Sequence, residues 1–170
     1  MSEERIVYLG LGANVGDPIA QCEWAIESLS TIPEITVLAR SSLYQTSPVG
    51  IIEQPDFINA VVKLRTTLSP RECLAHSLQL ETQQARVRDQ RWGPRTLDCD
   101  ILWMQGVDMD APGLRLPHPR MQERLFVLIP LAEIEPQFHL PSGEWITDRI
   151  RTLQDTCHDR VKQLATTPSN

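Results

Sequence analysis

Residues 57–72 read FINAVVKLRTTLSPRE, a strand pattern that leads directly into the start of a helix. Over Phe57–Thr66 every second side chain is apolar, and these side chains would share one face of a strand: Ile58, Ala60, Val62 and Leu64. Ser69, Pro70 and Glu72 then form a capping box with proline at the first helical position. This stretch predicts a half-buried strand followed by a helix, whose buried stripe we expect at Leu74, Leu78 and Ala85.

Toward the N-terminus the order is also strand and then helix. Residues 6–11 favour a strand, which ends in GLGAN, residues 10–14, a turn signal. Asp17 and Pro18 predict a helix start, and Pro33 predicts its end. We expect its buried stripe at Ile19, Cys22, Ile26 and Leu29.

The remaining elements follow the same kind of pattern. Residues 35–44 are extended, and residues 97–104 read as a strand whose alternate side chains Leu97, Cys99, Ile101 and Trp103 face the core. A last amphipathic helix is predicted from Ile146, Ile150, Leu153, Cys157, Val161 and Leu164.

The predicted order β-α-β-β-α-β is typical of the ferredoxin-like fold. We therefore predict an α+β sandwich, with helices on one face of a mostly antiparallel sheet and a C-terminal extension. A chain of 170 residues without a linker or repeat fits one domain, residues 1–170. A fold with this many known functions says little about activity by itself.

Charge and cysteine content exclude several classes of protein. The net charge of −6 argues against a general nucleic-acid or membrane-surface binder, since both need a basic surface. The acidic N-terminus lacks the pattern of a signal peptide, and no apolar run is long enough to span a bilayer. Cys22, Cys73, Cys99 and Cys157 form no CxxC pair, so we expect reduced thiols in a cytoplasmic protein.

Two aspartates interrupt the strand pattern at residues 97–104. Asp98 and Asp100 would share one face of the strand, and such a pair of carboxylates is stabilised by a cation between them. Mg²⁺ takes oxygen ligands and completes its coordination with water and substrate phosphates. The alternative is an ordinary solvated strand face, or pairing with arginines.

Arginines precede the aspartates in RWGPRTLDCDI, residues 91–101, and in the residues just before it. Pro94 cannot continue a helix, so Arg86, Arg88, Arg91 and Arg95 would border a loop. One guanidinium group can donate two parallel hydrogen bonds to phosphate oxygens. Arginines beside carboxylates that bind a metal ion therefore indicate phosphoryl-type transfer. A solvated charged loop is the alternative, although it would not explain why Trp92 lies within it.

Two further groups of residues predict ligand contacts. Phe57 and Asn59 share a strand face next to YQTSPVG, residues 44–50, and an aromatic ring beside a carboxamide suits a flat nitrogen-rich heterocycle. The alternative places Phe57 in the core and Asn59 in a turn. In LPHPRMQERLF, residues 116–126, His118 precedes Arg120 and Arg124, which favours a second anion-binding patch.

Taken together, the segments LGLGAN, YQTSPVG, QPDFINAVV, RWGPRTLDCDI and LPHPRMQERLF resemble the 6-hydroxymethyl-7,8-dihydropterin pyrophosphokinase family over almost the whole chain. The resemblance implies a ferredoxin-like enzyme of folate biosynthesis that transfers pyrophosphate from ATP to 6-hydroxymethyl-7,8-dihydropterin and releases AMP. It implies two Mg²⁺ ions, small-molecule partners without nucleic acid or membrane, and we expect a monomer. The two rival functions are a metal-dependent nuclease or nucleotidyltransferase, and a non-catalytic pterin- or nucleotide-binding paralogue.

The resemblance also implies roles for individual residues. Asp98 and Asp100 would hold the metal ions, and Arg86 and Arg95 would complete the catalytic set. The pterin would be bound by Thr46, Val49, Phe57, Asn59, Trp92 and Phe126. ATP would be contacted by Glu81, Arg88, Ile101, His118 and Arg124. Glu81 also breaks the apolar stripe of its helix, either because the stripe ends there or because it faces the site.

Overall fold

The computed structural model describes residues 3–48, 54–87, 97–157 and 159–164, and the side chains of residues 85–87 lie outside this description. Strands and helices follow in the order β1 (Arg5–Ala13), α1 (Pro18–Ser30), β2 (Ile35–Arg40), β3 (Tyr44–Thr46), β4 (Phe57–Thr66), α2 (Pro70–Val87), β5 (Asp98–Met104), β6 (Met109–Ala111), β7 (Leu114–Leu116), the 3₁₀ helix η1 (Met121–Glu123), α3 (Leu125–Ile134), α4 (Ile146–Thr156) and β8 (Val161–Gln163). Among the described residues, no helix is long and apolar enough to cross a membrane.

The main sheet has the strand order and the antiparallel pairing of the predicted ferredoxin-like plan. β1 lies between β4 and β5, and both pairings are antiparallel. The segment expected to be extended over residues 35–44 forms two strands, and β2 and β3 pair with opposite halves of β4. β8 continues the sheet beyond β3, and β6 and β7 form a separate hairpin.

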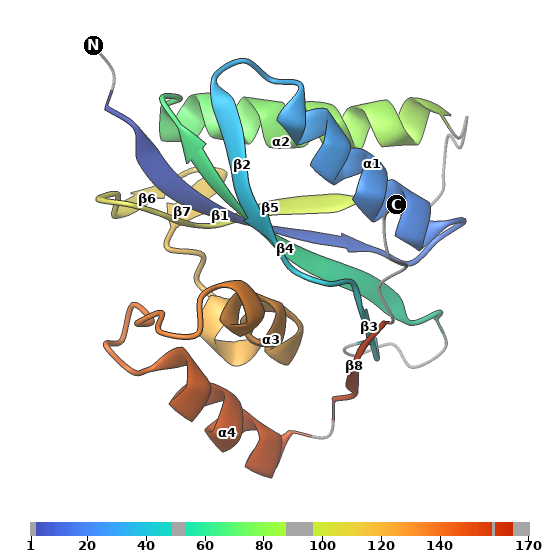
Figure 1. The fold of residues 1–170 in the computed structure, drawn as a ribbon, viewed down its shortest axis with the longest axis vertical. Helices are drawn as coiled ribbons and strands as arrows, with labels where there is room; N and C mark the ends of the chain where they lie inside the picture. The colour runs from blue at the N-terminus through green and yellow to red at the C-terminus, as the bar shows by residue number, and fades with distance from the viewer. Residues whose placement is uncertain (1–2, 49–53, 88–96, 158, 165–170) are drawn as a thin grey trace.

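Helices α1 and α2 cover one face of this sheet (Figure 1). As predicted, Asp17 caps α1 by accepting a hydrogen bond from the Ala20 backbone N–H at 3.2 Å. Ser69 and Glu72 form the predicted capping box at the start of α2, with distances of 3.2 and 3.0 Å. The core beneath the two helices contains the alternate residues of β1, β4 and β5: Val7, Leu9, Leu11, Ile58, Ala60, Val62, Leu64, Cys99 and Ile101.

Two details of the predicted stripes are wrong. Leu78 is 51% exposed, because α2 is turned so that the small Ser77 faces β5 and hydrogen-bonds the Cys99 thiol. The described buried residues of α2 are Cys73, Ser77, Leu80 and Gln84. Ile19 is 47% exposed, because it lies at the edge of an α1 stripe centred on Cys22, Ala25 and Leu29.

The C-terminal extension forms a further layer on the opposite face of the sheet, with α3 and α4 below it in Figure 1. The sequence pattern did not predict α3, which contains Pro130 and is apolar on nearly every side. The predicted last helix, which extended to Leu164, is too long. The observed helix α4 ends at Thr156, and Val161 begins β8. Val161 follows helical spacing in the sequence, but its backbone pairs with Thr46 of β3 instead.

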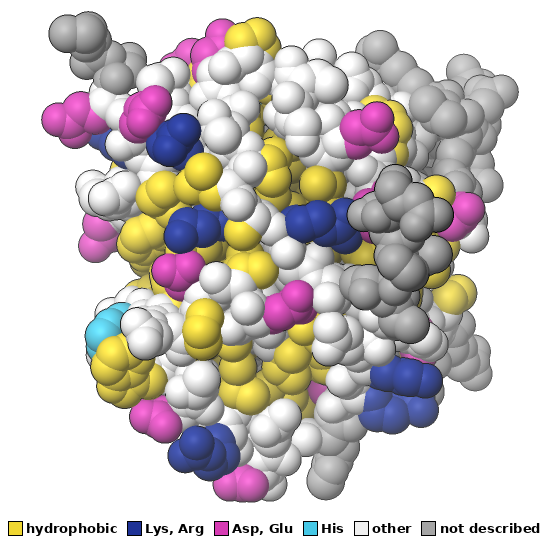
Figure 2. Space-filling view, viewed as in Figure 1, with side chains coloured by type: hydrophobic (Ala, Val, Ile, Leu, Met, Phe, Trp, Pro, Cys, Tyr) yellow, Lys and Arg dark blue, Asp and Glu magenta, His cyan; other side chains and the backbone are white. Residues whose placement is uncertain are grey.

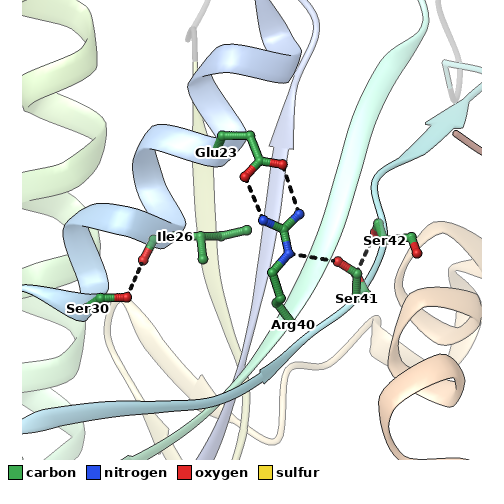
Figure 3. Close-up of polar contacts among 6 residues, drawn as sticks. All are labelled: Glu23, Ile26, Ser30, Arg40, Ser41 and Ser42. Carbon is green, nitrogen blue, oxygen red and sulfur yellow. Dashed lines mark hydrogen bonds and ion pairs between the residues drawn. The ribbon is translucent and has the colours of Figure 1, made fainter. Parts of the chain in front are cut away.

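Polar contacts hold β2 and β3 in place on the side of β4 away from β1. Arg40 on β2 makes a paired ion contact with Glu23 on α1, with N–O distances of 2.6 and 3.0 Å (Figure 3). Glu133 on α3 accepts hydrogen bonds from the Ser42 backbone at 3.0 Å and from the Tyr44 hydroxyl at 2.5 Å. Burial, followed by the contact with Glu133, raises the pKa of Tyr44, so this hydroxyl remains a donor. Strand β3, which lies between β4 and β8, is therefore fixed to the layer of α3.

Candidate active site

Asp98 and Asp100 lie on the same face of β5, as predicted from their spacing. Asp98 is half-buried and Asp100 is exposed, while the intervening Cys99 and the next residue Ile101 are buried on the α2 side. The antiparallel register places Gly12 of β1 beside Asp98, and Gly10 beside Asp100. The two carboxylates therefore project toward the layer of α3, next to positions without side chains.

A bulge ends this alternation one residue beyond Ile101. Tyr8 pairs with Trp103, but the next residue, Leu9, pairs with Ile101, so Leu102 is an extra residue in β5. Trp103 was expected in the same core as Ile101. That expectation is wrong, because the bulge turns Trp103 to the other face, where it packs with Tyr8 and Phe138.

The two glycines of β1 make the floor of the site. A Cβ added at Gly12 would lie 2.7 Å from Oδ1 of Asn59, closer than any normal contact. A Cβ at Gly10 would lie 3.3 Å from Cδ2 of Leu102, the end of a flexible side chain. Gly12 pairs with Asn59 on one side and with Asp98 on the other. Only one strand thus separates the carboxamide from the first carboxylate.

A cavity of about 360 Å³ opens above this floor. Its walls include Gly10, Gly12, Thr46, Ser47, Gln54, Phe57, Asn59, Asp98, Asp100, Leu102, Arg120, Glu123, Arg124, Phe126 and Asp159. Asn59 is 7% exposed and donates from Nδ2 to Thr46 Oγ1 at 2.6 Å, which fixes the carboxamide. The Arg124 guanidinium lies 5.5 Å from the centroid of the Phe126 ring. Residues predicted from distant parts of the sequence therefore meet in one cavity.

A second cavity of about 290 Å³ lies on the other side of Asp100. His118 and Ile101, both predicted to contact ATP, contribute to its walls together with Arg115. Among the described residues, Asp100 alone lines both cavities. A ligand that filled the second cavity would therefore meet one in the first cavity at this carboxylate.

His118 is held in its neutral form by its surroundings. Burial lowers its pKa; Asp100 opposes this effect, and Arg124 and Arg120 add to it. Nδ1 of His118 accepts a hydrogen bond from the Arg120 backbone N–H at 3.1 Å. The neutral ring then carries its hydrogen on Nε2, which can donate to an anionic ligand.

Several predicted site residues lie outside the described part of the chain, and one described residue, Glu81, lines neither cavity. Val49, Arg88, Trp92 and Arg95 lie outside the described residues, as does Arg91 of the predicted arginine loop. Arg86 belongs to the last turn of α2, but its side chain also lies outside the description. Glu81 is half-buried near β5, where its charge adds to the effect of burial that raises the pKa of Cys99 to about 12. It is not among the described residues that line either cavity.

Other residues of the cavity were not predicted to belong to the site. The GLGAN segment was taken as a turn signal after Leu11, but β1 continues to Ala13, so both glycines lie within the strand. Gly, Leu, Gly at residues 10–12 could have indicated a strand face without side chains. Gln54, Glu123 and Asp159 give no comparable signal, since single polar residues in loops are common.

Comparison with known proteins agrees with this geometry. Residues 8–136 match the model of the 7,8-dihydro-6-hydroxymethylpterin-pyrophosphokinase family, HPPK. The chain belongs to the HPPK family. It is 43% identical to the 2-amino-4-hydroxy-6-hydroxymethyldihydropteridine pyrophosphokinase of Pseudomonas aeruginosa, over 84% of this chain and 88% of that one. The enzyme of the same name from Methylorubrum extorquens is 42% identical, over 91% of this chain and 98% of its relative.

Solved structures show the HPPK fold at much lower identity. A crystal structure of Plasmodium falciparum HPPK-DHPS superposes with a TM-score of 0.70 at 12% identity and covers 92% of this chain. A crystal structure of HPPK-DHPS in complex with substrates gives a TM-score of 0.71 at 12% identity. This chain spans 47% and 45% of the lengths of those two chains. The likeness therefore supports the HPPK fold alone.

Proposed function

We propose that this chain transfers the pyrophosphoryl group of ATP to the hydroxymethyl group of 6-hydroxymethyl-7,8-dihydropterin, with AMP as the second product. Membership of the HPPK family supports the reaction, and the two cavities that meet at Asp100 support its two-substrate character. The first cavity has the aromatic and carboxamide groups for a pterin. The second has a neutral histidine and a nearby arginine for a nucleotide.

Asp98 and Asp100 would hold the magnesium ions, for which they are chemically suited. Both are carboxylates on one strand face, and neighbouring glycines leave space beside them. The described residues contain no group of three or more His, Cys, Asp or Glu side chains placed to hold a metal ion. That fits a site in which water and ATP phosphates supply the remaining ligands. When bound, the metal ions neutralise phosphate charge and align the triphosphate with the acceptor hydroxyl.

The remaining residues would bind and orient the two substrates. Phe57 and Phe126 would stack on the pterin ring, and Asn59, fixed by its bond to Thr46, would read its polar edge. We also propose the roles that follow from the family resemblance for residues that are not described or do not line the cavities: Arg86 and Arg95 in catalysis, Val49 and Trp92 at the pterin, Glu81 and Arg88 at ATP.

On the nucleotide side, His118 would donate from Nε2 to a phosphate oxygen, and Arg124 would add a positive charge beside Phe126. Ile101 would supply an apolar contact from the floor of the second cavity. The backbone of β5 links these contacts to the carboxylates, so nucleotide and metal would be positioned by the same strand. A cytoplasmic monomer remains our expectation.

The observation that carries the proposal is the position of the Asp98–Asp100 pair, one strand away from Asn59. The purified chain, incubated with ATP, MgCl₂ and 6-hydroxymethyl-7,8-dihydropterin, should release AMP and the pterin diphosphate in equal amounts. AMP release should stop when the pterin or the magnesium is omitted. Release of ADP, or pterin binding without turnover, would contradict the proposal and favour a non-catalytic paralogue.

A nuclease is the other class with paired aspartates, and its surface requirements differ. On the face shown in Figure 2, the described Lys and Arg side chains are separated by acidic and neutral ones, without a continuous basic surface. A nucleic-acid groove needs such a surface to bind phosphates along a strand. The net charge of −6 also argues against such a surface, and we expect no salt-sensitive binding of DNA or RNA.

A further inference from the structure

The segment after α4 lies along the edge of the first cavity. β8 pairs with β3, and Val161 is opposite Thr46. One residue further along, Ser47 donates from its backbone to the Arg160 carbonyl at 3.0 Å, and the Arg160 backbone donates to Ser47 Oγ at 3.0 Å. This reciprocal pair holds Asp159 beside the wall formed by Thr46 and Ser47, and Asp159 lines the cavity.

Among the contacts of the described residues, Asp159 keeps acceptor capacity in this position. The Cys157 thiol donates a hydrogen bond to its carboxylate, which raises the pKa of the thiol and uses one acceptor position. A carboxylate has two oxygens with about four acceptor positions in total. Asp159 is half-buried, so it can contact a ligand in the cavity while it stays partly hydrated.

The other acidic residues that line this cavity lie away from the proposed pterin position or have another proposed role. Glu123 also lines a neighbouring hollow with His118 and Arg149, and it lies next in sequence to Arg124. Asp98 and Asp100 lie across β1 from Asn59 and are our metal ligands. Asp159 lies on the side of Thr46 and Asn59, where we place the pterin.

The substrate named for the relatives is a 2-amino-4-hydroxypteridine. In its oxo form, the 2-amino group and the adjacent ring N–H point the same way, as the two N–H groups of a guanidinium do, and a carboxylate accepts both. We propose that Asp159 binds this edge of the dihydropterin and determines the preference for a 2-amino group. The inference rests on the proposed function and adds a substrate-binding residue from the part of the chain beyond the family match, which ends at residue 136.

The test compares two ligands in three proteins. Dissociation constants are measured for 6-hydroxymethyl-7,8-dihydropterin and for its analogue without the 2-amino group, in the wild type, Asp159→Asn and the control Asp155→Asn. Asp155 is an exposed acid on α4 and does not line the described cavities. In Asp159→Asn we expect about 10- to 100-fold weaker binding of the amino compound, because a hydrogen bond to a charged group contributes that much. The analogue keeps only the ring N–H as a donor to Asp159, so its binding should weaken less.

The ratio of the two dissociation constants decides the outcome. A ratio that collapses in Asp159→Asn, recovers in part in Asp159→Glu and is unchanged in Asp155→Asn supports the proposal. If Asp159→Asn has the same ratio of dissociation constants as the wild type, the proposal is overturned. Binding of an unreactive ATP analogue should be equal in all proteins, which shows that they are folded. If Asp159→Asn does not fold, Ser47→Ala replaces it, because this change removes the Oγ that accepts from the Arg160 backbone. The ratio of the two dissociation constants should then be smaller in Ser47→Ala than in the wild type. An unchanged ratio in Ser47→Ala overturns the proposal.

Failure of this inference can be told from failure of the proposed function. At saturating pterin, Asp159→Asn should still release AMP, since it keeps the metal carboxylates and the nucleotide cavity. An unchanged binding ratio together with AMP release would reject the role of Asp159 and leave the reaction intact. Absence of AMP release in the wild type would reject the reaction itself.

Discussion

The two faces of the central sheet are built from the same three strands but have different contents. Toward α1 and α2, the alternate residues of β1, β4 and β5 are buried and apolar, as in Leu9, Val62 and Ile101. Toward α3, the intervening residues begin apolar and then change to glycine, carboxamide and carboxylate, as in Gly12, Asn59 and Asp98. The first face stabilises the fold, and the second face holds the candidate site.

The change on the second face occurs one residue pair later in β4 than in β1 and β5, since Val61 lies opposite Gly10 and Asn59 lies opposite Gly12. Tyr8, Val61 and Leu102 pack under α3 and belong to one core cluster. Toward the other end of the sheet, β1 continues with Gly10, and β5 with Asp100. The layer of α3 and α4 thus covers part of this face, and the cavity occupies the rest. Substitutions on the two faces should therefore produce different kinds of damage.

The largest effect is expected for Asp100→Ala on the site face. Loss of a metal ligand removes several kcal/mol of transition-state stabilisation, so kcat should fall about a thousandfold. The exposed position of Asp100 predicts an unchanged free energy of unfolding. Steady-state AMP formation and urea unfolding measure the two quantities. Asp108→Ala, at an exposed acid outside both described cavities, is the control and should be neutral in both. Full activity in Asp100→Ala would remove the metal role.

Leu64→Ala on the opposite face should have the reverse signature. Leu64 is 1% exposed in the core under α1 and α2, and truncation there should lower the free energy of unfolding by about 3 kcal/mol. The kcat of the remaining folded protein should be close to that of the wild type. Urea unfolding and single-temperature kinetics check both. A loss of kcat without a loss of stability would contradict the division between the faces.

Gly12→Ala tests the floor that separates carboxamide from carboxylate. The new Cβ would collide with Asn59 Oδ1, so we expect KM for the pterin to rise about tenfold, since a misplaced hydrogen-bonding group loses its contact. Binding of an ATP analogue should change little. Gly10→Ala is the matched control, because its Cβ meets the flexible end of Leu102 at 3.3 Å. In an Asn59→Ala background, Gly12→Ala should cost nothing further, and additive losses would contradict the steric explanation.

The smallest effect is expected at the ion pair between Glu23 and Arg40 (Figure 3). Both side chains are partly exposed, so Glu23→Gln should lower the free energy of unfolding by less than about 1 kcal/mol. Turnover should be unaffected, since neither residue lines a described cavity. Thermal unfolding at low and high salt measures the pair, and a larger loss that salt does not reduce would contradict this assignment.

Local patterns in the sequence predicted the parts of the fold that depend on local geometry. Strand alternation placed Asp98 and Asp100 on one face, and the capping residues Asp17 and Ser69 marked two helix starts. Trp103 was misplaced because the bulge at Leu102 depends on pairing with β1, which alternation within β5 does not reveal. Asp159 gave no signal because its position depends on β8 pairing with β3, far away in the sequence.

The central claim is that Asp98 and Asp100 hold metal ions together with the nucleotide, and Mn²⁺ binding tests it most directly. Electron paramagnetic resonance can count Mn²⁺ bound to the protein with and without an unreactive ATP analogue. The wild type should bind two ions tightly only when the analogue is present, and Asp98→Asn with Asp100→Asn should abolish this binding. Equal Mn²⁺ binding by the wild type and the double variant would contradict the account.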